Sequence, residues 1–278
     1  MAEILLGIDF EEWFHPQLIQ SYLTNDEKEF KVTRGLDKIL NLLHKHDTVA
    51  TFFIVGEIVK KFPDILDKII SDGHEIGFHT MKHSRLDSPG FENFFSEELK
   101  EFSILTNNKS KGFRAPSFSL NSKSSWIINE LEKFNYVYDS SVVPTNTGMY
   151  GIPDAPKTPY YISEHSLEKN DPEGKILEFP LMVTDFLGKT IPACGGFYLR
   201  FLPFFIMKKT LRIYEKLSFP GAFFIHSWEL TPEFMPKIEM SIKDKFITYH
   251  NLDSTYDRMN SLLSEYRFTS FENFFKKI

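Results

Sequence analysis

Short apolar runs alternate along the chain with segments in which apolar residues recur every three or four positions. Runs of the first kind predict buried β-strands, and segments of the second kind predict amphipathic helices. The predicted strands are Ile4–Asp9, Ala50–Val55, Glu75–Phe78, Gly112–Arg114, Tyr136–Asp139, Ile176–Val183, Ala222–Ile225 and Phe268–Thr269. The predicted helices are Thr33–His46, Glu57–Asp72, Phe91–Leu105, Ser124–Phe134 and Leu252–Glu265.

This alternation of strands and helices predicts an α/β fold with a mainly parallel sheet. Gly73 is expected to close the second helix, and Asn121 or Ser122 is expected to cap the helix that begins at Ser124. The proline-rich, polar segment 145–171 is predicted to be a long surface loop near the functional site. No internal repeat or low-complexity segment divides the chain, and residues 1–278 are expected to form a single domain.

Polar residues that can carry chemistry lie at the carboxyl ends of the predicted strands. They are Asp9, His79, Arg114, Asp139 and His226. Because the carboxyl ends of parallel strands meet on one face of a barrel, we expect these side chains to form one site. The set extends from residue 9 to residue 226, so the whole chain would contribute to that site.

His79 and His83 are four residues apart, and neutral imidazole is a good ligand for zinc and similar metals. The alternative is a pair of solvated histidines one helical turn apart. Asp9, which Glu11 and Glu12 follow, can complete a metal site or act as a general base. It can equally cap a helix that begins near Glu11.

Three further residues could complete a hydrolytic site. Arg114 can hold and orient a base carboxylate, although it can also be an ordinary surface arginine. Asp139 can orient a catalytic histidine, contact substrate or simply cap a turn. His226 can protonate a leaving amine or be structural. Metal ligands, base, arginine and acid together are the groups that metal-assisted amide hydrolysis requires.

Charge and composition narrow the partners. The net charge is -6 and the isoelectric point is near 5.9, which argues against nucleic acid as a partner. Cys194 is the one cysteine, so no intrachain disulfide is possible. The sequence shows neither a signal-peptide pattern nor an apolar run long enough for a membrane span, which predicts a cytoplasmic protein, with peripheral contact at the inner membrane face as an option. The aromatic stretch Phe197–Lys209 is either a buried helix start around Pro203 or a surface for a membrane or lipid-linked substrate.

With these residues in place, the chain resembles the polysaccharide deacetylase family, also called the NodB-homology or carbohydrate esterase 4 family. The segments that resemble the family's motifs are Ala50–Gly56, Gly73–His83, Arg114–Phe118, Asp139–Ser141 and His226–Glu229. Glu178–Pro180 and Gly195–Pro203 resemble a branch associated with exopolysaccharide gene clusters.

The resemblance implies a distorted (β/α)7 barrel that removes N-acetyl groups from amino sugars. It implies one divalent metal ion, with zinc preferred and cobalt, nickel or manganese as alternatives. In this chain His79 and His83 would be ligands, Asp9 the base, Arg114 its partner and His226 the acid. The expected substrate contacts are Pro116, Phe118, Asp139, Ile225 and Trp228, of which Ile225 and Trp228 would wall the pocket for the acetyl methyl.

The first motif departs from the family pattern of two adjacent aspartates, base then ligand. Here Asp9 is followed by Phe10, Glu11 and Glu12. An Asp-x-Asp variant in some relatives would make Glu11 the ligand, with Asp9 or Glu12 as alternatives. The expected partner is an N-acetylated saccharide, lipid-linked or nucleotide-linked. Two other functions stay open: a metal-dependent amidase for a small non-sugar amide, and an inactive saccharide-binding module.

Overall fold

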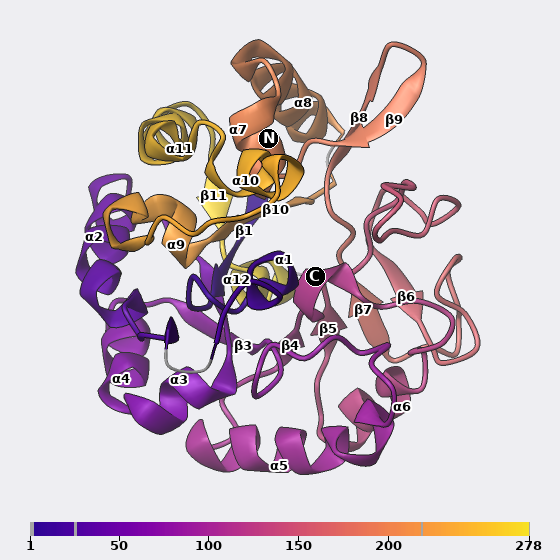
Figure 1. Ribbon diagram of the computed structural model, residues 1–278. Helices are drawn as coiled ribbons and strands as arrows, with labels where there is room; N and C mark the ends of the chain where they lie inside the picture. The colour runs from indigo at the N-terminus through magenta and orange to yellow at the C-terminus, as the bar shows by residue number, and fades with distance from the viewer. Residues whose placement is uncertain (1–2, 25–26, 218, 278) are drawn as a thin grey trace.

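The computed structural model describes residues 3–24, 27–217 and 219–277. Within them, nine strands form one curled sheet at the centre of the molecule, and helices surround most of its circumference (Figure 1). The strand order is β10-β1-β2-β3-β4-β5-β7-β6, and β11 pairs with the start of β1. The strands are β1 (Ile4–Phe10), β2 (Thr51–Ile54), β3 (Glu75–Phe78), β4 (Gly112–Phe113), β5 (Tyr138–Asp139), β6 (Tyr160–Ile162), β7 (Ile176–Glu178), β10 (Gly221–His226) and β11 (Phe268–Thr269).

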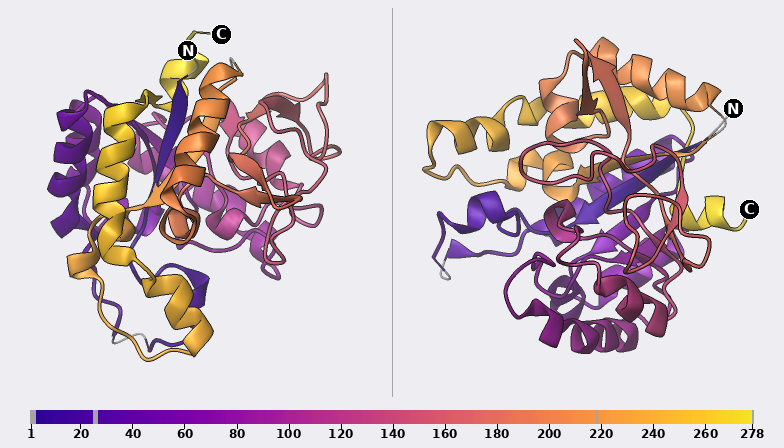
Figure 2. Two further views of the ribbon diagram at one scale, coloured as in Figure 1. Left: turned by 90° about the horizontal axis from the view of Figure 1, so that it is seen from above. Right: turned by 90° about the vertical axis from the view of Figure 1, so that its right-hand side faces the viewer.

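The described helices lie mainly outside the sheet, and Figure 2 shows β1 passing between α8 and α11. The longer helices are α2 (Val32–Lys45), α4 (Asp64–Ser71), α5 (Phe95–Leu105), α8 (Phe204–Lys216), α10 (Ile242–Tyr249) and α11 (Thr255–Glu265). The shorter ones are α1 (Gln17–Gln20), α3 (Gly56–Lys61), α6 (Ile127–Lys133), α7 (Gly196–Phe201), α9 (Ser227–Leu230) and α12 (Phe271–Phe275). No helix in the described part of the chain is long and apolar enough to cross a membrane.

The sheet closes irregularly into a barrel. All neighbours from β10 to β7 are parallel, whereas β6 is antiparallel to β7. Beyond β7, isolated bridges link Leu181 to Ala222 and Gly195 to Phe224, so the chain after β7 returns to β10. A hairpin, β8 (Val183–Phe186) and β9 (Lys189–Pro192), projects from this seam. The expected distorted (β/α)7 barrel is therefore confirmed.

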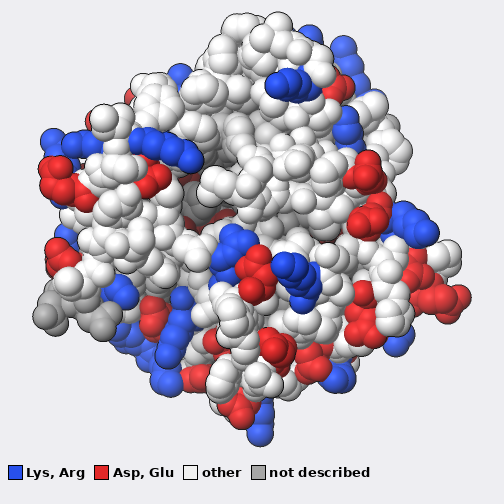
Figure 3. Space-filling view, turned by 45° about the vertical axis from the view of Figure 1, so that its right-hand side comes forward, with Lys and Arg blue, Asp and Glu red and all other residues white. Residues whose placement is uncertain are grey.

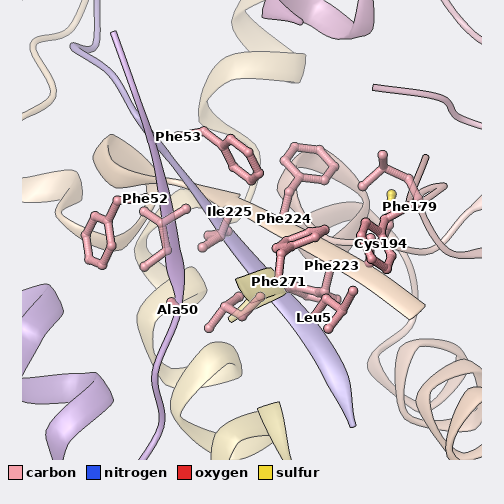
Figure 4. Close-up of a cluster of buried hydrophobic side chains, with 14 of the residues drawn as sticks. Leu5, Ala50, Phe52, Phe53, Phe179, Cys194, Phe223, Phe224, Ile225 and Phe271 are labelled. Atoms are coloured by element: carbon pink, nitrogen blue, oxygen red, sulfur yellow. The ribbon is translucent and has the colours of Figure 1, made fainter. Parts of the chain in front are cut away.

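Aromatic side chains fill the interior of the barrel (Figure 4). β1 is buried along its whole length, as parallel strands covered on both faces are. Phe271 meets Phe53 and Phe179 edge to face, with ring centroids 5.5 Å apart in both pairs. Cys194 is buried in the same cluster. This rigid core fixes the strand ends, and the functional side chains extend from those ends.

Several predicted boundaries were wrong for local reasons. The predicted helix Glu57–Asp72 is two helices, α3 and α4, because Pro63 interrupts it. The predicted strand Ile176–Val183 ends at Glu178, two residues before a proline. α6 begins at Ile127 rather than Ser124, and no side chain caps it. Asn121 and Ser122 therefore do not cap this helix, and turns occupy residues 122–126.

Two longer segments also differ from expectation. The predicted loop 145–171 contains β6, which adds an antiparallel edge strand to the sheet. The stretch Phe197–Lys209 covers the greater part of α7 and the start of α8, with Pro203 immediately before α8. It is only partly buried: Leu199 is inside, whereas Phe201 and Phe205 are exposed.

Candidate active site

The carboxyl ends of four strands meet at one place in the barrel. Asp9 at the end of β1 lies in register with His226 at the end of β10. His79 follows β3 and Arg114 follows β4, the next strand in the sheet. The structure thus brings together four of the five residues that strand ends predicted. Asp139 also ends a strand, but its side chain has different surroundings, described below.

Glu11, His79 and His83 form a buried group with the donor set of a metal site. One ligand atom from each residue lies within 4.8 Å of the others. The segment between the histidines is not helical, because Thr80 and His83 have left-handed backbone conformations with φ of 57°. The alternative of two solvated histidines on a helix was therefore wrong. The left-handed turn instead places both imidazoles beside Glu11.

Contacts from three directions hold Glu11. Its backbone N–H donates to Ser227 Oγ at 3.1 Å, and Ser227 Oγ donates to the Glu11 carbonyl at 2.6 Å. Trp228 Nε1 donates to Glu11 Oε1 at 3.0 Å, and His83 Nε2 lies 2.6 Å from Oε2. Burial alone would raise the pKa of Glu11, but His83, followed by His226, holds it well below its usual range. The carboxylate is therefore ionised, as a metal ligand must be.

His79 is held in the tautomer that a metal ligand needs. Its Nδ1 lies 2.7 Å from the Arg114 carbonyl oxygen, which only accepts, so Nδ1 carries the proton and Nε2 carries the lone pair. Burial lowers the pKa of His79 to about 4, so the ring is neutral. Among the described residues, His83 Nδ1 is buried without a hydrogen-bond partner. One carboxylate and two imidazoles therefore fit a zinc-type divalent ion.

Glu12 has a different role. Its Oε1 accepts hydrogen bonds from the backbone N–H groups of Lys31 and Val32, both at 2.8 Å, and so caps the start of α2. Burial raises the pKa of Glu12 to about 7. Residues 11–14 contain no helix, so the alternative of Asp9 as a helix cap was wrong. Of the three acids in this motif, Glu11 is the one in the described metal-type group.

Asp9 and Arg114 form a buried ion pair. Arg114 NH1 donates to Asp9 Oδ1 at 2.8 Å, while its Nε and NH2 donate to the backbone carbonyl and hydroxyl of Ser140, both at 3.0 Å. The guanidinium also lies 4.2 Å from the centroid of the Phe53 ring. A Cβ at Gly7 would overlap the guanidinium, so this position of β1 requires glycine. Arg114 thus fixes the orientation of the Asp9 carboxylate.

His226 is oriented by two residues that the sequence did not single out for a role. Its Nδ1 lies 2.7 Å from Glu229 Oε2, and Arg200 Nε donates to Glu229 Oε1 at 2.8 Å. Burial alone would lower the pKa of His226, but Glu229 raises it to about 9, with help from Glu11 and Asp9. Arg200 is itself anchored by the carbonyl groups of Ile247, Thr248 and His250. His226 is therefore an imidazolium that can donate a proton.

A cavity of about 410 Å³ borders His226, Trp228 and Arg200. Its wall is aromatic and includes Phe118, Tyr150, Phe197, Tyr198 and Trp228, and His226 reaches it with a side chain that is 23% exposed. Figure 3 shows the surface hollowed here, with acidic atoms visible at the floor. A second hollow of about 280 Å³ borders His83, and Gln17 and Arg85 line both.

The five predicted substrate contacts separate into two groups. Phe118 and Trp228 line the cavity. Pro116, Ile225 and Asp139 are buried and do not line it. Asp139 Oδ1 accepts from Ser141 Oγ at 2.7 Å, and that hydroxyl accepts from the Ala115 N–H at 2.8 Å. Asp139 therefore supports the chain that follows Arg114.

Beside this network, Asp139 and Glu178 form a buried acid pair, opposite each other in β5 and β7. Burial and the neighbouring Asp139 raise the pKa of Glu178 well above its usual range. Glu178 therefore makes the stability of the folded protein depend on pH. An acid whose pKa is raised in the folded state stabilises that state fully below its unfolded pKa, near 4.5, and this stabilisation is lost as pH rises. Glutamine at position 178 stays neutral at every pH. The free energy of unfolding of Glu178→Gln should therefore fall less steeply as pH rises, by up to ~1.4 kcal/mol per pH unit. Urea unfolding from pH 5 to pH 9 measures it, with exposed Glu168→Gln as control; equal slopes in all three proteins would contradict it.

Two family models match the chain. Residues 19–137 match the polysaccharide deacetylase family, and residues 140–276 match a domain of unknown function, DUF3473. A crystal structure assigned as a polysaccharide deacetylase from Mycobacterium smegmatis has a TM-score of 0.60 at 14% identity, covering 100% of this chain and 91% of that one, and so shares the fold. The sequence match to the polysaccharide deacetylase family thus extends from residue 19 to residue 137, and most of the rest of the chain matches DUF3473.

The curated relatives that the chain matches include two deacetylases. The chain is 40% identical over 81 residues to a peptidoglycan-N-acetylglucosamine deacetylase of Bacillus cereus, covering 29% of this chain and 28% of the relative. It is 37% identical over 83 residues to a chitooligosaccharide deacetylase of Rhizobium leguminosarum bv. trifolii, covering 29% of this chain and 36% of the relative. The matched region is thus well under half of either relative.

Proposed function

We propose that the protein is a metal-dependent deacetylase that removes N-acetyl groups from an amino sugar in a surface polysaccharide or its precursor. The observation that carries the proposal is the buried group of Glu11, His79 and His83, which contacts Trp228 in the wall of an aromatic cavity. Asp9 and His226 pair in register at the ends of β1 and β10. The names of the two curated relatives, which both describe deacetylases of amino-sugar polymers or oligomers, support the same chemistry.

Glu11, His79 and His83 would hold a divalent ion, with zinc preferred and cobalt, nickel or manganese as alternatives. When bound, such an ion polarises a carbonyl and makes water more acidic. Asp9 accepts the proton of the water that attacks the acetyl carbon, because Arg114 occupies Oδ1 and fixes the orientation of the carboxylate. The attack forms the new C–O bond.

His226 completes the reaction as the general acid. Glu229 occupies Nδ1, so the other ring nitrogen, Nε2, is the one that can give a proton to the departing sugar amine as the C–N bond breaks. The products are acetate and a free amine. Burial of Glu229 alone would raise its pKa, but His226 and Arg200 lower it to about 2, so it remains the charged partner that the imidazolium requires.

The cavity suits a saccharide substrate. Trp228 stacks on the His226 ring with centroids 5.2 Å apart, so a sugar amide that reaches the acid would also meet an aromatic face. Phe118 and Tyr150 form another part of the wall. The adjoining hollow, which shares Gln17 and Arg85 with the cavity, gives room for neighbouring sugar units or for the lipid or nucleotide of a linked precursor.

The test is acetate release from N-acetylated sugars, sugar nucleotides and chitooligosaccharides, with chelator and with zinc or cobalt added back. We expect release that the chelator abolishes and the metal restores, and a loss of ~10²–10⁴-fold in His226→Ala. A ring-opened acid from a cyclic amide, with no acetate from any saccharide, would favour the small-amide hydrolase instead. Saccharide binding without metal uptake or turnover would make the protein a binding module.

A further inference from the structure

Every exposed side chain of α8 is apolar or cationic. These residues are Phe205, Lys209, Arg212, Ile213 and Lys216, and exposed Phe201 and Leu217 flank the helix. Their spacing of three or four residues puts them on one face of the helix. Within the described residues, Lys209 and Lys216 have no ion-pair partner, whereas Arg212 lies near Tyr266 and Glu265. We call this set the α8 face.

Two neighbouring segments extend the same character. On α10, exposed Ile242 and Phe246 alternate with exposed Lys243 and Lys245. The Phe246 ring lies 6.2 Å from that of Phe201, so α10 adjoins the α8 face. The tip of the β8–β9 hairpin carries Leu187, which is 87% exposed. The hairpin and α8 project from the same end of the molecule (Figures 1 and 2).

At the opposite end of the molecule, exposed apolar residues lie among acidic residues. Phe94 and Ile104, at the two ends of α5, are 60% and 67% exposed. They lie in a segment with exposed Glu92 and Glu97. Apolar side chains among carboxylates do not suit an anionic surface, whereas those among lysines and arginines do.

We propose that the α8 face, with the exposed side of α10 and the hairpin tip, binds the surface of a lipid bilayer that contains anionic lipids. Phe205, Ile213 and Leu217 enter the interface between headgroups and acyl chains, while the cations contact the lipid phosphates. The chain as a whole carries a charge of -6, so this local positive charge opposes the overall balance. The inference does not depend on the proposed activity.

Charge also decides between a membrane and a second copy of the chain. In a two-fold dimer the same patch lies against itself. Such a dimer through the α8 face would place Lys209, Arg212 and Lys216 opposite their own copies, where like charges repel. An anionic bilayer neutralises these groups and accepts the intervening aromatic and aliphatic side chains.

The proposed surface adjoins the active site. Phe197 lines the cavity, and its ring stacks on that of Phe201 with centroids 5.2 Å apart. Ile247, next to Phe246 on α10, also lines the cavity. A protein bound through this surface would hold the rim of its cavity close to the lipid headgroups.

Flotation with phosphatidylcholine vesicles, with and without phosphatidylglycerol, tests the proposal. We expect binding only to the phosphatidylglycerol vesicles, and weaker binding as salt screens the charges. The double variant K209Q/K216Q should lose roughly 25-fold in binding, about fivefold per cation. The double variant F205S/I213S should lose at least about tenfold, because burial of apolar area is removed.

Matched controls at the opposite end are K100Q/K109Q and F94S/I104S, whose parent residues are also exposed. Both controls should bind as the parent does, and circular dichroism should show all variants folded. No binding of the parent protein to phosphatidylglycerol vesicles at low salt would overturn the proposal. So would equal losses in the α8 and α5 variants, or a dimer in sedimentation that F205S/I213S dissociates.

Discussion

Glu11→Gln is expected to lose its metal, whereas the neighbouring Glu12→Gln is expected to keep it. The Glu11 carboxylate lies beside His83 and Trp228, and it belongs to the buried group with His79. Glutamine is neutral at this position and a poor ligand, so we expect metal affinity to fall by more than ~100-fold, beyond the effect of outer-shell changes. Acetate release at limiting metal should fall to background.

The adjacent residue supplies the control. Glu12 accepts the Lys31 and Val32 N–H groups through Oε1, and a glutamine oxygen can accept the same two bonds. Glu12→Gln should therefore bind metal and release acetate as the parent does. Calorimetric titration of each apoprotein with zinc measures both affinities without turnover. If Glu11→Gln kept its metal and Glu12→Gln lost it, the assignment of Glu11 as the carboxylate ligand would be wrong.

Local patterns were enough to predict much of the sheet. Glu75–Phe78 and Phe268–Thr269 are strands with the predicted bounds, because each apolar run ends at a polar residue. Pro63 breaks a helix whose apolar spacing continues beyond it, which shows a backbone constraint overriding periodicity. β6 could not be predicted in this way, because a three-residue edge strand depends on its pairing with β7, distant in sequence.

The same distinction holds for the site. The strand-end rule brought Asp9, His79, Arg114 and His226 together correctly, because parallel strands share one carboxyl edge. It could not choose between Glu11 and Glu12, since that choice depends on where α2 begins in space. Glu229 lies three residues after His226, a spacing that could have indicated a contact.

Arg200 offered no comparable local pattern. It reaches Glu229 from a helix 29 residues earlier in the chain, and carbonyl groups at the end of α10 and just beyond it hold its guanidinium. Each of these contacts joins segments that are distant in sequence. Only the folded chain brings them together, so the resemblance of Gly195–Pro203 to a family branch did not reveal what Arg200 contacts.

Arg114→Met is expected to lower the free energy of unfolding by ~3–5 kcal/mol, because it leaves the Asp9 carboxylate buried without its counter-ion. Arg114 is fully buried, and its pair with Asp9 has both side chains at most 3% exposed. The methionine also loses the two bonds to Ser140. Urea unfolding at neutral pH measures the change. Acetate release should fall as well, since the base is no longer oriented.

The double variant Asp9→Asn with Arg114→Met separates the two effects. With both charges removed, no uncompensated ion remains, so stability should recover much of the loss while acetate release stays ~10²–10⁴-fold down for want of a base. Arg85→Met is the stability control, because the Arg85–Asp87 pair is solvent-accessible and should contribute at most ~1 kcal/mol. If Arg114→Met were as mild as Arg85→Met, or the double variant less stable than Arg114→Met alone, the buried charge would not explain the stability of this site.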